Sequence, residues 1–510
     1  MSSSPRIELL LLLSVLACND PKVHPRPGAD SGLPDMADDS GRDSSTPEAC
    51  SPGILGEEDG RPLRLSETAD QETDFGVAAS NFGLCTFPEQ SSEPAYLWVT
   101  TSSNWFAYTR PNWYGAYLLE SSAWEGDGVL GHGAQPLLYV DDRFRTMMTA
   151  TGLTLDESAP MGGFAVTTSR TSSDELDGSY IWLAASAPTR ETDFIWWADT
   201  EIFVESLDGV ASVFADLNGD GLDDAFVPGY QTRIFLSPMM STVFDEDADI
   251  VFPAILPDEI APFQPTSAAA VDLDHDGYLD LVWKQPAGER DNHTQFDLLF
   301  KRGPIAQDWD APDARIVDEV SALPENSWGS SYTQSSTVRA VGDVTGDGYA
   351  DVTATFSYDA GGRDGSGSLI VIEAWPEGTV ALEDVPTRLV GVPGDIPDMP
   401  SHSNLGSGGS GDVNGDGVDD LVVFQAYTGL YSGDERRVYI APGPLSGLVV
   451  LEDASVQVRL PRGAGATNEH NAAMVVPDLD GDGLDDVIVN VIDGGDLPGA
   501  VWLFAGCDAW

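Results

Sequence analysis

Basic residues are scarce in this chain. Its 510 residues contain 24 lysines and arginines against 84 aspartates and glutamates, which gives a formal net charge of -60 at pH 7. Only Lys22, Lys284 and Lys301 are lysines. At such a charge, long-range repulsion slows the approach of nucleic acids, anionic membrane surfaces and acidic polymers. We therefore expect no nucleic-acid partner and favour divalent cations as ligands.

Cysteine and histidine are also rare, with four and six residues. They show no pairing at a spacing typical of zinc or copper sites. The chain also lacks the GxSxG nucleophile elbow, the HExxH metalloprotease motif and the phosphate-binding GxxxxGK(S/T) motif. These absences argue against the corresponding enzymes, and we expect a protein without catalytic residues.

A long apolar segment is missing at the N-terminus. The run from Leu9 to Ala17 has nine residues, whereas a membrane-spanning helix needs about 20. We interpret residues 1–18 as an export signal. The letters VLAC, ending at Cys18, resemble a bacterial lipobox, in which the cysteine is acylated. This predicts a lipoprotein on the bacterial outer membrane or cell surface, bound to the membrane only through Cys18. The alternative is a secreted protein with Cys18 incidental.

Three cysteines remain if Cys18 is acylated, namely Cys50, Cys85 and Cys507, an odd number for an oxidising compartment. The simplest outcome is one disulfide and one free thiol. A bond from Cys507 to either of the others would tie the two ends of the folded region together. The sequence leaves the pair open.

The segment from 19 to 58 is rich in Pro, Asp, Ser and Gly and nearly free of aromatic and β-branched residues. It cannot bury enough apolar surface to offset the entropy of ordering. We therefore expect a disordered tether over residues 19–58, followed by a folded region over residues 59–510.

Short apolar runs dominate the rest of the chain. Rich in Val, Ile, Trp, Tyr and Phe, they alternate with clusters of Gly, Pro, Asn and Asp, and no long helical stripe competes with them. Examples are SYIWLAAS at 179–186, FDLLFKRG at 296–303 and RRVYIAPG at 436–443. This pattern is typical of an all-β protein.

An acidic nonapeptide occurs five times. The copies are DLNGDGLDD from Asp216, DLDHDGYLD from Asp272, DVTGDGYAD from Asp343, DVNGDGVDD from Asp412 and DLDGDGLDD from Asp478. The mean spacing is (478 - 216)/4 = 65.5 residues, about the length of one four-stranded blade of a β-propeller. The folded region is about seven times this length. We therefore expect a seven-bladed β-propeller.

Five of these blades, within residues 201–510, would carry the acidic loop. Residues 59–200 contain no copy of it. They are expected to form degenerate blades, and the alternative is a separate β-sandwich domain.

The nonapeptide places oxygen atoms at regular positions. Positions 1, 3 and 5 are Asp, Asn or Thr, position 6 is always Gly, and position 9 is always Asp. In a tight loop the alternate side chains converge, the glycine permits the turn, and the position 7 carbonyl points inward. About six hard oxygens at flexible distances suit Ca²⁺ better than Mg²⁺. The predicted ligands of about five calcium ions are Asp216, Asn218, Asp220, Leu222, Asp224, Asp272, Asp274, Asp276, Tyr278, Asp280, Asp343, Thr345, Asp347, Tyr349, Asp351, Asp412, Asn414, Asp416, Val418, Asp420, Asp478, Asp480, Asp482, Leu484 and Asp486.

A plain turn and an EF-hand loop both account less well for the nonapeptide. Asp, Asn and Gly form turns without any metal, but plain turns need not repeat their carboxylates in register five times. EF-hands require a Glu at position 12 and flanking helices, whereas position 12 here is apolar and the following segments resemble strands. Position 2 is always Leu or Val, which predicts an inward-facing anchor for each loop.

The units resemble FG-GAP repeats, also called VCBS repeats, the blades of the integrin α-chain propeller and of many bacterial surface proteins. The likeness is fullest over residues 405–444, where LGSGGSGDVNGDGVDDLVVF is followed by RRVYIAPGP. It implies a seven-bladed propeller with calcium near one face of individual blades. It does not imply an integrin-type ligand, because no metal-dependent adhesion domain is visible.

The leading hypothesis is a non-enzymatic, calcium-binding protein of the cell envelope that binds a protein or glycan ligand in adhesion or surface assembly. The first alternative is an extracellular polysaccharide-degrading enzyme of the lyase type, which would need clustered basic residues that the sequence does not show. The second alternative is a purely structural envelope protein.

Overall fold

The computed structural model describes the backbone of 25 segments within residues 53–510. They are 53–55, 61–63, 79–85, 96–101, 114–120, 135–140, 144–156, 163–170, 178–184, 200–204, 212–228, 232–239, 243–252, 267–290, 293–306, 311–317, 338–356, 367–391, 402–428, 435–453, 456–461, 472–476, 478, 482–491 and 500–510. The predicted signal segment 1–18 with its lipidation site Cys18, and residues 19–52 of the predicted tether, lie outside them.

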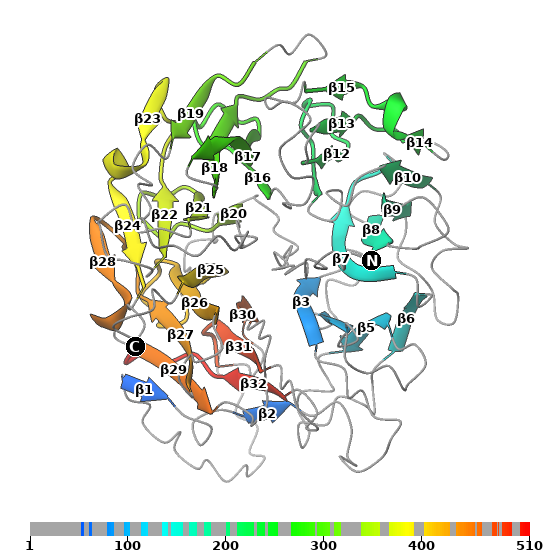
Figure 1. Ribbon diagram of the computed structural model, residues 1–510. Coiled ribbons are helices and arrows are strands. Elements are labelled where there is room, and N and C mark those ends of the chain that lie inside the picture. Colours follow the sequence, from blue (N-terminus) through cyan, green and yellow to red (C-terminus); the bar gives the residue numbers. More distant parts are fainter. Residues whose placement is uncertain are drawn as a thin grey trace, which may run out of the picture.

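The described residues form seven small sheets of four or five strands (Figure 1). Their only helical elements are short 3-10 turns, and none of their helices is long and apolar enough to cross a membrane. The all-β prediction is therefore confirmed. Strands form because the apolar runs are short and rich in β-branched and aromatic residues, which pack well on a pleated surface.

Numbered in chain order, sheets 1 to 3 cover the first half of the folded region. Their main strands are β3 (Ala79–Cys85), β4 (Tyr96–Thr101), β5 (Tyr114–Glu120) and β6 (Gln135–Val140) in sheet 1; β7 (Phe144–Leu153), β8 (Gly163–Arg170), β9 (Gly178–Ala184) and β10 (Thr200–Val204) in sheet 2; and β11 (Val213–Ala215), β12 (Asp224–Val227), β13 (Arg233–Phe235) and β15 (Ile250–Val251) in sheet 3.

Sheets 4 to 7 follow the same antiparallel meander. Their main strands are β16 (Ala268–Val271), β17 (Asp280–Arg290), β18 (His293–Lys301) and β19 (Ala314–Val317) in sheet 4; β20 (Val338–Val341), β21 (Asp351–Phe356), β22 (Ser368–Ile372) and β24 (Thr387–Val390) in sheet 5; β25 (His402–Gly411), β26 (Asp420–Thr428), β27 (Glu435–Ala441) and β29 (Val456–Pro461) in sheet 6; and β30 (Ala472–Val476), β31 (Asp486–Val491) and β32 (Ala500–Phe504) in sheet 7.

The sheets stand in a closed circle. The first strand of each sheet contacts the first strand of the next, from β3 through β7, β11, β16, β20 and β25 to β30, and β30 contacts β3 again. Figure 1 shows the chain passing once around a common centre, from blue to red. This is the arrangement of a β-propeller. Residues 79–204 contribute two sheets to the circle.

Two strands from the N-terminal side complete the last two sheets. β1 (Gly53–Leu55) pairs with β29 of sheet 6, and β2 (Arg61–Leu63) pairs with β32 of sheet 7 (Figure 1). β1 lies inside the expected tether 19–58, so residues 53–55 are corrected from tether to strand. β2 lies within the expected folded region 59–510, but it belongs to the last sheet instead of a degenerate N-terminal blade. Three-residue strands have no periodicity of their own, so backbone pairing with distant strands decides their structure.

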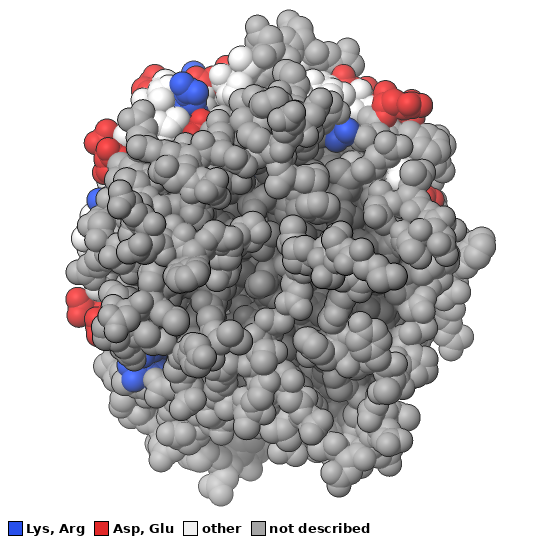
Figure 2. Space-filling model, in the orientation of Figure 1, with Lys and Arg blue, Asp and Glu red and all other residues white. Residues whose placement is uncertain are grey.

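Other sheets gain a fifth strand in a similar way. β14 (Val243–Phe244), β23 (Thr379–Ala381) and β28 (Leu448–Val450) each run parallel to the last strand of the preceding sheet. A 3-10 turn follows each of them: η5 (Asp245–Asp247), η6 (Leu382–Asp384) and η7 (Leu451–Asp453). The turns expose acidic pairs, and Figure 2 shows acidic side chains at the rim near β15, β24 and β28.

The hydrophobic core lies between neighbouring sheets. Val282 and Phe300 of sheet 4 pack in one buried cluster with Val352 and Ile370 of sheet 5, and similar clusters join sheets 2 to 3, 3 to 4, 5 to 6 and 6 to 7. Both faces of an inner strand are therefore covered. This explains why β21 is buried at all six positions.

Two of the few cations also link sheets from inside. Lys284 of β17 donates a hydrogen bond from Nζ to the carbonyl of Thr355 in sheet 5 at 2.7 Å and lies 4.4 Å from the centroid of the Phe356 ring. Arg339 of β20 donates to the carbonyl of Ser407 in sheet 6 at 3.2 Å. Burial lowers the pKa of Arg339 to about 10.

Cys507, directly after β32, is buried and disulfide-bonded. Cys50 lies outside the described residues, and for Cys85 only the backbone in β3 is described. The choice between these two partners therefore stays open.

Candidate metal centre

The five nonapeptide loops occupy the same place in five consecutive sheets. Each loop connects the first strand of its sheet to the second, from β11–β12 in sheet 3 to β30–β31 in sheet 7. Equivalent connections of a circle of meanders lie on one face of the molecule. The loops are numbered 1 to 5 in chain order, beginning at Asp216, Asp272, Asp343, Asp412 and Asp478.

Position 1 folds each loop around its carboxylate. In all five loops one carboxylate oxygen of this aspartate accepts the N–H of the position 6 glycine, at distances from 2.8 Å in loop 3 to 3.1 Å in loop 4. The glycines have φ between 91° and 95°, a left-handed conformation that other residues rarely adopt. Any side chain at position 6 would therefore strain the loop.

Position 5 completes the turn. Its Oδ1 accepts the N–H of position 7 at 2.9 Å in every loop, as in Tyr278 to Asp276 and Val418 to Asp416. The position 1 and position 5 aspartates thus bend the backbone into the same shape five times. A side-chain carboxylate does this because it presents several acceptor sites to nearby backbone donors.

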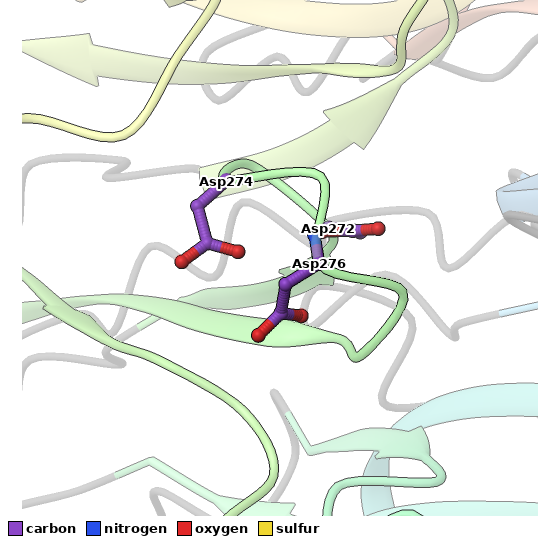
Figure 3. A group of neighbouring side chains, drawn as sticks. All are labelled: Asp272, Asp274 and Asp276. Carbon is purple, nitrogen blue, oxygen red and sulfur yellow. Dashed lines mark hydrogen bonds between the residues drawn. The ribbon is translucent and has the colours of Figure 1, made fainter.

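Loop 2 brings three carboxylates together (Figure 3). One oxygen from each of Asp272, Asp274 and Asp276 lies within 4.8 Å of the other two, the only such group of acidic, histidine or cysteine side chains within the part of the chain that the structure describes. Asp274 Oδ1 is buried and makes no hydrogen bond. The other oxygen, Oδ2, lies 2.9 Å from Nε of Arg302.

Loop 4 contains a second orphaned carboxylate oxygen. Asp412 Oδ1 is buried without a hydrogen bond, although the other oxygen accepts from Gly417. Leaving a buried charged oxygen unsatisfied is unfavourable, so a cation beside it would be strongly stabilising. The donor set is made of hard oxygens only, which fits Ca²⁺.

Loops 1, 3 and 4 have Asn or Thr at position 3, so each lacks the third carboxylate. In each of them the position 3 side chain donates a hydrogen bond to an aspartate of the same loop. Thr345 donates to the position 9 aspartate of its loop, Asn414 does the same, and Asn218 donates to Asp220. In loop 5, Asp480 lies outside the described residues. The metal-ligand roles predicted for these side chains and for the position 7 carbonyls stay predictions.

Position 9 differs from the other acidic positions, because its aspartate is fully buried in all five loops. In loop 4, Asp420 Oδ2 accepts the N–H of Val413 at 3.1 Å, and Asp420 Oδ1 accepts the N–H of Gly443 after β27 at 3.0 Å. Asp280 makes the same pair of contacts with Leu273 and Gly303. The contacts seen are therefore those of an anchor for the loop, and metal binding by position 9 stays a prediction.

Burial has an electrostatic consequence at position 9. Desolvation, opposed by the backbone hydrogen bonds and reinforced by the neighbouring loop aspartates, raises the pKa of Asp224, Asp351 and Asp420 to about 7 and the pKa of Asp280 to about 6. A cation in the loop would oppose these shifts, because it favours the ionised form.

The loops also connect neighbouring sheets. The position 2 carbonyl accepts an N–H from the next sheet, from Ile305 to Leu217, Trp375 to Leu273, Leu445 to Val344 and Cys507 to Val413. The side chains of these four position 2 residues are at most 1% exposed, which confirms the predicted anchor role. Loops 1 to 4 are therefore each hydrogen-bonded to the next sheet as well as being part of their own.

Sequence reasoning missed the aspartates at position 8. Asp485 of loop 5 accepts the N–H of Asp412 at 2.9 Å through Oδ2 and returns its own N–H to the Asp412 carbonyl at 3.1 Å. Asp223 makes the same reciprocal pair with Thr154. Three of the five copies have Asp at position 8, and that repetition was the available signal.

Thr154 marks the place of a sixth, degenerate loop. It follows β7 in sheet 2 and pairs with Asp223 as Asp412 pairs with Asp485. Its spacing from Asp216 is 216 - 154 = 62 residues, close to the mean of the five copies. Thr154 therefore puts no carboxylate at position 1 of this connection.

Two substitutions in loop 4 test whether Asp420 anchors the loop and whether Asp416 binds the metal. Asp420→Ala leaves two backbone donors without an acceptor, so we expect it to destabilise the protein by about 2–4 kcal/mol with or without calcium. Asp416→Asn keeps an oxygen for the Val418 N–H but removes a charge. We expect it to leave the melting temperature in EGTA unchanged and to reduce the gain from added calcium. Equal effects of both variants in EGTA would contradict the division of roles.

A protein-family model matches the part of the chain around loop 2. Residues 265–294 match the FG-GAP repeat, a stretch that contains β16, loop 2 and β17. The sequence placed the fullest likeness at 405–444, around loop 4. Loop 2 has aspartates at positions 1, 3 and 5, whereas loop 4 has Asn414 at position 3.

Two solved structures also match the chain. The C-terminal WD40 domain of Sif2 is 9% identical with a TM-score of 0.34, over 84% of this chain and 96% of that domain. BBS1N, solved in complex with ARL6DN, is 13% identical with a TM-score of 0.27, over 66% of this chain and 87% of its own.

Proposed function

We propose that this protein is a calcium-stabilised, seven-bladed β-propeller of the cell envelope that binds a macromolecular ligand without catalysing a reaction. The observation that carries the calcium assignment is the group of Asp272, Asp274 and Asp276, with the buried Asp274 Oδ1 left without a hydrogen bond. Each of the seven sheets would be one blade.

Calcium would act as a clamp between blades. Asp216, Asp272, Asp343, Asp412 and Asp478 fold their loops in the same way, so each of the five loops is a candidate for one ion. Because the described loops accept hydrogen bonds from the next sheet, an ion that orders a loop also orders the contact between two blades. The proposed role of the metal is therefore structural.

The proposed location is supported by the N-terminal sequence. An export signal over residues 1–18 would take the chain out of the cytoplasm, and acylation of Cys18 would anchor it to a membrane. The disulfide at Cys507 is in keeping with an oxidising compartment. Free calcium near 1 mM outside cells would keep weak calcium sites filled.

A glycan array combined with a polysaccharide degradation assay tests the ligand class. We expect no degradation of any polysaccharide, because both described lysines are engaged, Lys284 inside the protein and Lys301 in an ion pair with Asp313. Cleavage products from the wild-type protein would overturn the non-enzymatic assignment. Capture of glycans without cleavage would identify the ligand as a sugar.

A further inference from the structure

Loops 2 and 3 depart from the other loops at the same position. Position 7 is tyrosine in both, Tyr278 and Tyr349, and their side chains are 44% and 48% exposed, whereas the corresponding Leu222 is buried. Loop 2 also differs at position 4, which is glycine in the four other copies and His275 here. His275 has φ of 61°, the only non-glycine residue with a positive φ in the described part of the chain.

Three exposed aromatic side chains stand on loops 2 and 3, and two of them are in contact. The rings of His275 and Tyr349 are stacked, with centroids 3.5 Å apart and planes inclined by 22°. Tyr278 lies in the same loop as His275, and its ring covers the backbone of Gly219 in loop 1, leaving no room for a Cβ there. His275 combines a positive φ with a ring that stacks on an exposed tyrosine. A strained backbone of this kind persists where surrounding contacts or function require it.

Each tyrosine stands on an acidic loop of a strongly anionic protein. Flat aromatic faces attract cations, and arginine gains most because its planar guanidinium stacks on them. The net charge of -60 attracts positively charged partners from a distance.

The protein already uses this chemistry once at the same boundary. Arg302 lies with its guanidinium carbon 4.7 Å from the centroid of the Trp375 ring and its Nε 2.9 Å from Asp274 of loop 2. Trp375 belongs to sheet 5, so this arginine is held between an aromatic face and a loop carboxylate. Tyr278 and Tyr349 present aromatic rings to solvent on loops 2 and 3.

We infer that the exposed rings of Tyr278, His275 and Tyr349 form a docking surface for an arginine-bearing segment of a basic protein. This rests on the proposed function as a binding protein and specifies its partner class. The preference for arginine over lysine distinguishes this surface from general attraction by a negatively charged protein, because only arginine stacks as a plane.

The test uses a fluorescent peptide of alternating Arg and Gly, a matched Lys-Gly peptide, and the full chain in calcium at about 150 mM salt, where long-range attraction is screened. We expect tighter binding of the arginine peptide by wild type. Tyr278→Leu with Tyr349→Leu should weaken arginine binding about tenfold and remove the preference over lysine. Tyr278→Phe with Tyr349→Phe, which keeps both rings, should bind as wild type does.

Unchanged arginine binding by the leucine variant, or equal binding of both peptides by wild type, would overturn the inference. Binding of a neutral glycan that depends on the same tyrosines, without arginine preference, would overturn it in favour of a sugar site. Calcium binding and thermal stability of the leucine variant are measured in parallel. If these equal wild type, a failed peptide test leaves the calcium-dependent fold intact and removes only the partner class.

Discussion

Chelating calcium with EGTA is expected to lower the melting temperature of the full chain by roughly 2–8 °C, and added Ca²⁺ should restore it where Mg²⁺ does not. Extracellular calcium modules have dissociation constants of about 0.1–1 mM. At about 1 mM free Ca²⁺, mass action gives each site about 0.4–1.4 kcal/mol, or about 2–7 kcal/mol for five sites. The range in degrees follows from an unfolding entropy of about 2.1 cal/mol/K per residue over about 430 residues.

The calcium effect should grow with pH. A buried aspartate with its folded-state pKa raised above its unfolded value of 3.8 contributes stability below that value, and the contribution is lost as pH rises through the folded pKa. For Asp224, Asp280, Asp351 and Asp420 the loss runs from about pH 4 up to the folded pKa of about 6 to 7. In EGTA the melting temperature should therefore fall from about pH 4 to pH 7, and calcium should oppose this fall.

Calorimetric titration provides the matched measurement, with about five ions expected per chain. Asp274→Asn should lower that number by about one, because it removes a charge from the cluster of loop 2. A melting temperature that is the same in EGTA and in excess calcium would contradict the metal assignment for the whole set of loops.

Deleting residues 1–64 is expected to cause the larger loss of stability, because the deletion removes β1 and β2, the edge strands that complete sheets 6 and 7. Each strand pairs three residues with a distant partner, at about 1 kcal/mol net per hydrogen bond. Leu55, 9% exposed, also leaves the cluster between sheets 6 and 7, which costs about 2 kcal/mol more. The sum, about 5–8 kcal/mol, is comparable with the whole stability of a typical domain.

A shorter deletion, of residues 2–45, is the control, since it keeps both strands and Cys50. We expect the shorter variant to melt as wild type does and the longer one to lose its cooperative transition. A synthetic peptide of residues 50–66 added to the longer variant should restore part of the transition. Equal melting curves for the two deletions would show that sheets 6 and 7 do not depend on β1 and β2 for their stability.

Much of the architecture was predictable because it repeats. Five copies of one nonapeptide indicated the unit length, and position 2 of the repeat predicted the buried anchors Leu217, Leu273, Val344 and Val413. The glycine at position 6 predicted a sharp turn, and the structure gives it a positive φ. The turn and the anchor position both lie within the nonapeptide, so the local sequence was enough to predict them.

The buried position 9 aspartates were predictable as members of the loop but not as anchors. Asp420 accepts from Gly443, which lies 23 residues further on, and Asp486 accepts from Gly506 in the same way. No pattern within the nonapeptide indicates a partner at that separation. The same reason hid the stacking of His275 on Tyr349, which joins two loops from different sheets.

The amino-acid sequence by itself determined the strand content, the repeat and the oxygen-rich loops, because side-chain chemistry and short-range turn geometry decide these. Only the tertiary structure decided that β1 and β2 complete sheets 6 and 7, that position 2 and position 8 of the loops connect neighbouring sheets, and that two tyrosines stand exposed on these loops. Those features arise from pairing between segments far apart in the chain, which burial of apolar faces between the sheets brings together.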